Sequence, residues 1–157
     1  MTDELEAVQS DMPKFDRSVS LLCWGYNEEK SIGEYLERAI ALMDATVEDY
    51  EIVLIDDGST DRTYEIAKSF QDKHPQLKIF QNECNLNVGI SSRRAIQRAS
   101  KEFLFWQTID WCYDISDLRQ HLEYLKQYDI VQGVEKTGYR RHRINSTFSN
   151  TNALMWY

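Results

Sequence analysis

At 157 residues, with 42% hydrophobic and 28% charged side chains, the chain is long enough for one globular domain that buries a core. Its formal net charge of −8 argues against a general nucleic-acid binder, and no apolar run approaches the roughly 18–20 residues that span a bilayer. The acidic N-terminus does not fit a signal peptide, and three scattered cysteines fit reduced thiols in the cytoplasm rather than disulfides or a zinc site.

Residues 1–17 are polar and acidic, and they are expected to form a flexible lead-in to a single domain over residues 18–157. In that domain, strand-like and helical patterns alternate along the chain. Strands are predicted at residues 19–24, 52–55, 77–80, 103–108 and 130–134, and helices at about 32–43, 62–73, 90–100 and 116–128. This alternation predicts an α/β fold with a mainly parallel, doubly wound sheet and helices on both faces.

The last five residues, 153–157, read Ala-Leu-Met-Trp-Tyr and end without a glycine cap or a polar tail. We therefore expect the domain to be incomplete at its C-terminus. The alternative is that this segment packs onto the core as a final helix. An exposed apolar end would also favour self-association, so a homodimer is expected.

The most informative segment begins with the apolar run 52–55, which reads as a buried strand and is followed at once by Asp56 and Asp57. In open α/β sheets, ligands bind at the carboxyl ends of such strands, and carboxylates there accept hydrogen bonds from N–H and O–H groups. A phosphate-binding loop would instead need glycines and a lysine. The turn therefore points to the base and sugar of a nucleotide. The structural alternative is a plain Asp-Gly turn with Asp61 capping the next helix.

Polar residues also follow two other predicted strands: Tyr26, Asn27 and Glu28 after the first, and Asp110 after the fourth. Adjacent parallel strands bring such ends together at one edge of the sheet. Asp110 could then bind a divalent cation that bridges a ligand diphosphate, since Mg²⁺ and Mn²⁺ often take only one or two carboxylates plus phosphates. The alternative is a loop carboxylate beside Trp111 with no ligand.

These residues resemble motifs of the family 2 glycosyltransferases of the GT-A fold. Residues 26–29, Tyr-Asn-Glu-Glu, look like the family's Tyr-Asn-Glu loop, and residues 55–61 match its Asp-Asp-Gly-Ser-Thr-Asp motif in full. Residues 85–89 and the Arg-bearing helix after them resemble its Asn-x-Gly segment, with slightly shorter spacing than usual. Residues 103–110 resemble the strand that leads into its Asp-x-Asp metal motif. The resemblance covers roughly residues 18–134.

The resemblance implies a transferase that takes the sugar from a nucleotide-diphospho-sugar donor, bound with Mg²⁺ or Mn²⁺, and passes it to an acceptor. The residues it assigns to the nucleotide-sugar are Tyr26, Glu28, Asp56, Asp57, Arg93 and Arg94. Within this set, Tyr26 and Glu28 would line the base and ribose pocket, and Asp57 with Asp56 would bond the base or ribose. One of the two arginines would lie near the nucleotide. Asp110 would coordinate the metal as the second Asp of Asp-x-Asp.

Within the family, the nearest subgroup suggested by the resemblance is the polyprenol-phosphate sugar transferases. It would place the protein in the cytoplasm, at the inner face of a membrane. The acceptor stays open between a lipid-linked molecule and a saccharide, and the donor base stays open between uridine and guanosine.

The chain departs from the family pattern in ways that affect catalysis. Thr108 stands where the first Asp of Asp-x-Asp is usual, and Trp24-Gly25 replaces the usual Pro before the Tyr-Asn-Glu loop. Only about 23 residues follow residue 134, so no catalytic base is assigned. A catalytically inactive nucleotide-sugar-binding module, or a fragment of a larger transferase, is therefore the alternative. A receiver-type regulatory domain fits less well because no lysine evidently follows the fifth strand. Trp106 is expected in the core.

Overall fold

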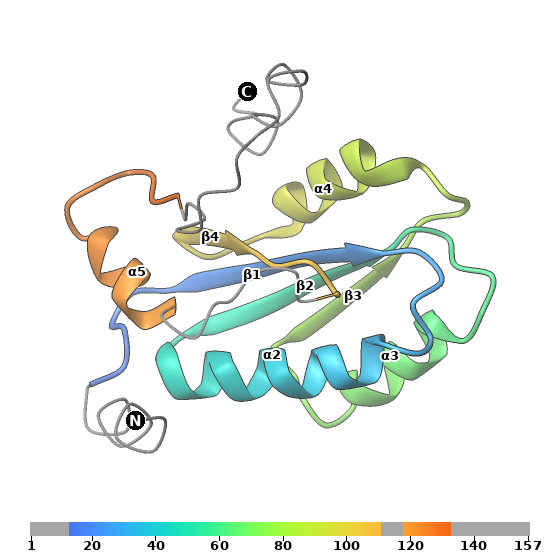
Figure 1. The fold of residues 1–157 in the computed structure, drawn as a ribbon, viewed down its shortest axis with the longest axis horizontal. Helices are drawn as coiled ribbons and strands as arrows, with labels where there is room; N and C mark the ends of the chain where they lie inside the picture. The colour runs from blue at the N-terminus through green and yellow to red at the C-terminus, as the bar shows by residue number, and fades with distance from the viewer. Residues whose placement is uncertain (1–12, 111–117, 133–157) are drawn as a thin grey trace, which may run out of the picture.

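The computed structural model of the protein describes residues 13–110 and 118–132. Its four strands are β1 (Val19–Gly25), β2 (Tyr50–Asp56), β3 (Leu77–Gln81) and β4 (Phe103–Trp106). They pair in parallel in the order β3-β2-β1-β4. The chain thus moves outward from β1 to β3 and then returns to the other side of β1 for β4 (Figure 1). The carboxyl ends of β1 and β4 therefore flank a topological switch point, where open α/β sheets bind ligands.

The helices are α2 (Ile32–Thr46), α3 (Thr63–Gln71), α4 (Asn87–Arg98) and α5 (Leu118–Tyr124), and they cover both faces of the sheet (Figure 1). Side chains alternate between the faces along each strand. Leu21 and Leu54 join a core with α2, α3 and α5, whereas Leu22 and Val53 join a second core with Ala95 of α4. The predicted doubly wound α/β fold is therefore confirmed. No helix in the described ranges is both long and apolar enough to cross a bilayer.

Several predicted elements differ from the structure in their extent: β4 ends at Trp106 rather than at residue 108, and α5 ends at Tyr124 rather than at residue 128. Residues 130–132 form no strand, and the rest of the predicted strand 130–134 lies outside the described residues. Helix α4 begins at Asn87 rather than at residue 90, so the last three residues of the predicted turn 85–89 are helical. The apolar segment 153–157 also lies outside the described residues.

The core also differs from the prediction at two aromatic residues. Phe15, expected in the loose lead-in, is fully buried and forms a parallel bridge with Val47 at the end of α2. Trp106, expected in the core, is 50% exposed and packs against Trp24 with ring centroids 6.0 Å apart. The reason is topological: β4 lies at the edge of the described sheet, and α4 packs over β1 and β2 instead.

A buried carboxylate, Glu51 of β2, fastens the amino end of the sheet. It accepts hydrogen bonds from the hydroxyls of Ser20 (2.6 Å) and Ser100 (2.9 Å) and pairs with the ammonium of Lys78. Burial alone would raise the pKa of the Glu51 carboxyl, but Lys78 and the serine donors lower it from 4.5 to about 2. These contacts join β1, β2 and β3 to the segment that leads into β4.

This network predicts a stability change with pH. Because the pKa of Glu51 is lowered in the folded state, its stabilisation is complete above about pH 4.5 and is lost as the pH falls toward 2. Glu51→Gln should therefore lower the free energy of unfolding at neutral pH by roughly 1–3 kcal/mol. It should also flatten the loss of stability in acid, measured by urea unfolding from about pH 7 to pH 3.

The matched control is Glu83→Gln, which removes the same charge from an exposed side chain. It should leave both the stability at neutral pH and the acid slope close to those of the original chain. An acid slope unchanged by Glu51→Gln would show that Glu51 does not carry the pH dependence.

Candidate functional site

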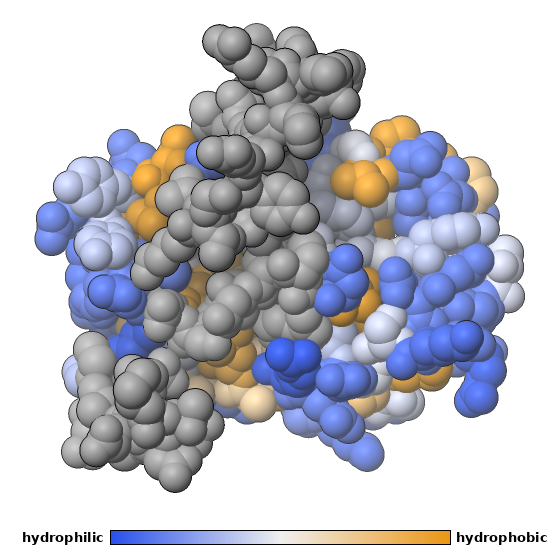
Figure 2. All heavy atoms as spheres, in the orientation of Figure 1, coloured by the Kyte–Doolittle hydropathy of each residue, from blue (hydrophilic) through white to orange (hydrophobic). Residues whose placement is uncertain are grey.

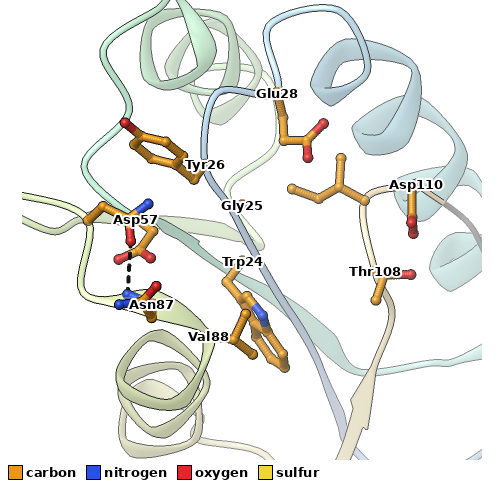
Figure 3. Close-up of a pocket in the computed structure, with 11 residues that line it drawn as sticks. Trp24, Gly25, Tyr26, Glu28, Asp57, Asn87, Val88, Thr108 and Asp110 are labelled. Atoms are coloured by element: carbon orange, nitrogen blue, oxygen red, sulfur yellow. Dashed lines mark hydrogen bonds between the residues drawn. The ribbon is translucent and has the colours of Figure 1, made fainter.

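A cavity of about 310 Å³ opens at the carboxyl edge of the sheet, beside the switch point between β1 and β4 (Figure 3). Its volume lies at the lower end of the range of roughly 300–1,000 Å³ that small-molecule sites occupy. Four segments line it: Trp24, Gly25, Tyr26 and Glu28 after β1; Asp57 after β2; Asn85, Asn87 and Val88 at the start of α4; and Thr108, Ile109 and Asp110 after β4.

The polar groups of the cavity are divided between its two sides. Tyr26 and Asp57 lie on one side, and Thr108 and Asp110 lie on the other, with Gly25 between them (Figure 3). A ligand that spans the cavity would thus meet an aromatic ring and a carboxylate at one end and further oxygen groups at the other. At Gly25, a Cβ atom would come within 2.4 Å of Ile109 Cδ1, so the glycine allows Ile109 to pack there.

The Asp57 carboxylate is 5% exposed and is held by donors from two other elements. Its Oδ1 accepts hydrogen bonds from the Asn82 amide (2.7 Å), the Ser91 hydroxyl (2.8 Å) and the backbone N–H of Leu86 (2.9 Å). The backbone N–H of Asn87, the first residue of α4, donates to Asn85 Oδ1 at 3.0 Å. The N-cap residue of α4, Leu86, supplies no side-chain cap of its own. Asp57 therefore caps α4 from the loop after β2.

These donors also set the charge of the site. Burial raises the pKa of the Asp57 carboxyl, but the backbone N–H of Leu86, the Asn82 amide and the Ser91 hydroxyl outweigh burial and lower it below the usual 3.8. Asp57 is therefore ionised at neutral pH and presents a hydrogen-bond acceptor to the cavity.

The loops after β1 and β2 are tied together by hydrogen bonds in both directions. The backbone N–H groups of Asn27, Glu28 and Glu29 donate to Ser59 Oγ (2.9 Å), Thr63 Oγ1 (2.7 Å) and Asp61 Oδ2 (3.2 Å), and Thr60 N donates to Asn27 Oδ1 (2.9 Å). Asp61 also accepts from Thr63 N (3.0 Å), although the N-cap residue of α3 is Arg62 and not Asp61. Most polar residues of the two motifs therefore hold Tyr26, Glu28 and Asp57 in position.

Gly58 brings the loop after β2 against the loop after β3. Its φ of +73° lies in the left-handed region, and a Cβ atom there would come within 2.4 Å of the backbone carbonyl carbon of Cys84. Only glycine meets both conditions without strain. This close contact keeps the segment that carries Asn82 and Leu86 next to Asp57.

The structure brings four of the predicted site residues together: Tyr26, Glu28, Asp57 and Asp110 all line the cavity. Asp56 does not line it and is 1% exposed. Because adjacent strand residues face opposite sides, Asp56 points away from α4, and its Oδ2 accepts from Gln81 Nε2 at 2.8 Å. Its position favours fastening β2 to β3 over contact with a ligand in this cavity.

The two arginines lie on α4, and neither Arg93 nor Arg94 is among the residues that line the cavity. Arg94 donates instead to Asn82 Oδ1. The sequence-based prediction missed Asn82 and Ser91, because their contact with Asp57 joins residues 25 and 34 positions apart. A buried Asp predicted at a strand end gives a reason to look for such donors, but the spacing does not identify them.

The cavity fits a divalent cation only if the bound molecule supplies most of the ligands. In the part of the chain that the structure describes, no three His, Cys, Asp or Glu side chains converge on a point. The Glu28 carboxylate accepts from Ser31 Oγ at 2.5 Å, whereas Asp110 and the hydroxyl of Thr108 lie together on the side of the cavity away from Asp57 (Figure 3). Oxygen ligands of this kind suit Mg²⁺ or Mn²⁺, which keep several sites for phosphate and water.

Comparison with known families explains this arrangement. The profile of the family described as "Glycosyl transferase family 2" matches residues 25–151. The chain belongs to this family. It is 41% identical over 71 residues to an undecaprenyl-phosphate 4-deoxy-4-formamido-L-arabinose transferase of Edwardsiella ictaluri, a match that covers 45% of the chain and 22% of the relative. It is 28% identical over 142 residues to a chondroitin synthase of Escherichia coli, a match that covers 85% of the chain and 20% of that synthase.

Solved glycosyltransferase structures share the fold, and the predicted GT-A type is therefore confirmed. A mannosyltransferase of Pyrobaculum calidifontis in complex with GDP-Man and Mn²⁺ superposes with a TM-score of 0.61 at 20% identity, covering 78% of the chain and 38% of that protein. Residues 1–349 of TarS from S. aureus in complex with UDP superpose with a TM-score of 0.60 at 26% identity, and the match covers 77% of the chain and 37% of that structure. The chain thus spans less than half the length of each protein compared.

The close contact at Gly58 gives a test of the loop geometry. Gly58→Ala should lower the free energy of unfolding by more than about 1 kcal/mol, because it combines an unfavourable φ with a backbone clash. Gly89→Ala is the matched control: no atom lies within 4 Å of its added Cβ, so stability should stay the same or rise by up to about 1 kcal/mol. Urea unfolding of both variants measures the difference, and equal stabilities would contradict the described contact.

Proposed function

We propose that the protein binds a nucleoside diphosphate sugar in this cavity and contributes the donor site of a glycosyltransferase. One observation carries the proposal: Asp57 and Asp110, which follow different strands, lie at opposite sides of one cavity at the switch point of the sheet. Membership of glycosyl transferase family 2 supports it, and so do the GDP-Man and UDP complexes of the structural neighbours.

On the Asp57 side, the chain's own residues suit a nucleoside. Uracil and guanine each present a ring N–H donor, and the ionised Asp57 carboxylate is an acceptor for it. The ring of Tyr26 is 41% exposed and can pack against the base or the ribose. Glu28 remains a candidate for the ribose hydroxyl groups, with its carboxylate oriented by Ser31.

On the opposite side, Asp110 and Thr108 would hold a divalent cation together with the donor diphosphate. Such a cation would stabilise the negative charge of the leaving nucleoside diphosphate as the bond to the anomeric carbon breaks. One of Arg93 and Arg94 stays a proposed neighbour of the nucleotide through α4, whereas Asp56 fastens β2 to β3 next to the same loop.

The names of matched relatives point to two acceptor classes. They include transferases that act on undecaprenyl phosphate and dolichyl phosphate, as well as chondroitin synthase. We assign no residue of the described chain to deprotonation of an acceptor. A module that binds the nucleotide-sugar without transferring it is favoured as the second candidate by Thr108, which leaves Asp110 as the one carboxylate of this motif.

The metal role of Asp110 gives the first binding test. Isothermal titration calorimetry with UDP and GDP should show tighter binding with Mn²⁺ or Mg²⁺ than in EDTA. Asp110→Asn should remove most of this metal dependence while leaving metal-free binding nearly unchanged, since the neutral amide is a poorer cation ligand. Equal affinity with and without metal in the original chain would contradict the metal role, and no binding of either nucleotide would contradict the proposed function.

The second binding test uses Asp57→Asn. The donors around Oδ1 force the new side chain to keep its oxygen toward α4, so its NH₂ group would face the cavity. The N3–H donor of uracil would then face a second donor, whereas the N3 acceptor of cytosine would face a group that donates a hydrogen bond to it. UDP should bind roughly 5- to 150-fold more weakly, equivalent to about 1–3 kcal/mol, and CDP should gain relative to UDP.

The asparagine variant is preferable to Asp57→Ala because it keeps the acceptor that caps α4, so that a loss of binding is not a loss of fold. Urea unfolding of both variants is the control, and Asp57→Ala should be the less stable of the two. An unchanged preference between UDP and CDP in Asp57→Asn would place the base elsewhere.

A further inference from the structure

We propose that Asn82, held by Arg94, is a positioning residue that fixes the Asp57 carboxylate in the orientation that receives the nucleotide base. This inference rests on the proposed function, because Asp57 is the proposed contact to the base. Asn82 lies outside the sequence motifs and does not line the cavity, whereas Asp57, to which it donates, does.

Asn82 is well placed to orient another side chain. It is 5% exposed and directly follows β3, and its backbone N–H donates to the carbonyl oxygen of Asp56 at 2.8 Å. Its side-chain NH₂ group donates both to Asp57 Oδ1 (2.7 Å) and to Ser91 Oγ (2.8 Å). Ser91 in turn donates to the same Asp57 oxygen. The three side chains come from three separate elements and form a closed triangle.

The neighbours of Asn82 permit only one orientation of its amide. In the observed orientation, the amide oxygen accepts from the guanidinium of Arg94 and the NH₂ group faces the Asp57 carboxylate. Turning the amide over would place its oxygen against that carboxylate and its NH₂ group against the Arg94 cation. Arg94 therefore determines which end of the amide meets Asp57.

The triangle leaves a defined part of Asp57 for a ligand. Asn82, Ser91 and the backbone N–H of Leu86 all donate to Oδ1, which fixes that oxygen on the α4 side. The other oxygen, Oδ2, then remains for a donor on the ligand. The donors are neutral groups, so the carboxylate keeps its negative charge toward the cavity.

Asn82→Asp tests this role because it keeps the size of the side chain and replaces the donors with a second carboxylate. Arg94 can still bond one oxygen of the new Asp, while the other would lie against Asp57 Oδ1. Two carboxylates at hydrogen-bond distance share a proton, and the pKa of the pair rises. The other charged and titratable groups around the site are Tyr26 on the Asp57 side of the cavity, Glu28 and Asp110 elsewhere on its wall, and Arg94 on α4, and they are the same in both proteins.

The experiment measures the dissociation constant of UDP and of GDP for the original chain and for Asn82→Asp from about pH 5.5 to pH 8.5. For each nucleotide, the dissociation constant of Asn82→Asp is divided by that of the original chain at the same pH. This ratio cancels the titration of the ligand itself. At low pH, the proton shared by the two carboxylates replaces the hydrogen bond that the Asn82 amide donates to Asp57 in the original chain. The ratio should therefore stay within about threefold of one. As the pH rises and this proton leaves, the ratio should increase to roughly tenfold or more.

Two controls separate positioning from other effects. Gln97→Glu adds the same negative charge at an exposed position of α4 and should give a ratio near one at every pH.

Arg94→Ala should weaken binding less when Asn82 is already Ala than in the original chain, because Arg94 acts through Asn82. Arg98→Ala, which removes a positive charge from the same helix, should have an equal and small effect in both backgrounds.

The outcomes distinguish the two levels of the proposal. If the original chain binds no nucleotide, the proposed function fails. If it binds and the ratio for Asn82→Asp does not change with pH, the positioning role of Asn82 fails while the proposed function stands. If Asn82→Asp does not fold, the Arg94 and Asn82 double-variant cycle decides: fully additive losses would mean that Arg94 contacts the ligand directly and would overturn the inference.

Discussion

The Asp57 carboxylate connects three elements at the carboxyl edge of the sheet. It lies directly after β2, caps the N-terminus of α4, and accepts a hydrogen bond from the Asn82 amide in the loop after β3. Gly58 makes this meeting possible because its missing side chain lets the loop after β3 approach within contact distance. The position of the candidate base site and the start of α4 therefore depend on the same group. A change that removes this carboxylate will affect both helix stability and ligand binding.

Two buried carboxylates of β2 and its following loop use different partners at the two ends of the sheet. Glu51, at the amino end, pairs with the cation of Lys78 and is neutralised within the protein. Asp57, at the carboxyl end, is held by amide, hydroxyl and backbone N–H donors that carry no charge. Such donors keep the carboxylate ionised without cancelling its charge. The end of the sheet that faces the cavity thus retains an acceptor for a ligand, whereas the other end serves stability.

The local patterns in the sequence are sufficient for most of the elements and for the family, but not for contacts between distant segments. The apolar run at 52–55 and the helical spacing in α2 predicted their elements because burial alone decides them. The start of α4 was predicted three residues late because its cap comes from Asp57, about 30 residues earlier. Strand alternation, applied one residue further, would have placed Asp56 and Asp57 on opposite faces. Asn82 and Phe15 carry no local signal, since distant partners give them their roles.

In the proposed function, a nucleotide occupies the cavity between the Asp57 side and the Asp110 side. Amide chemical-shift mapping by NMR during titration with UDP or GDP and Mg²⁺ tests it most directly, because it locates the ligand without any substitution. We expect the largest shifts at the backbone amides of Gly25, Tyr26, Asp57 and Val88, which border the cavity. Shifts centred on the amino end of the sheet around Glu51, or no shifts with ligand in excess, would contradict it.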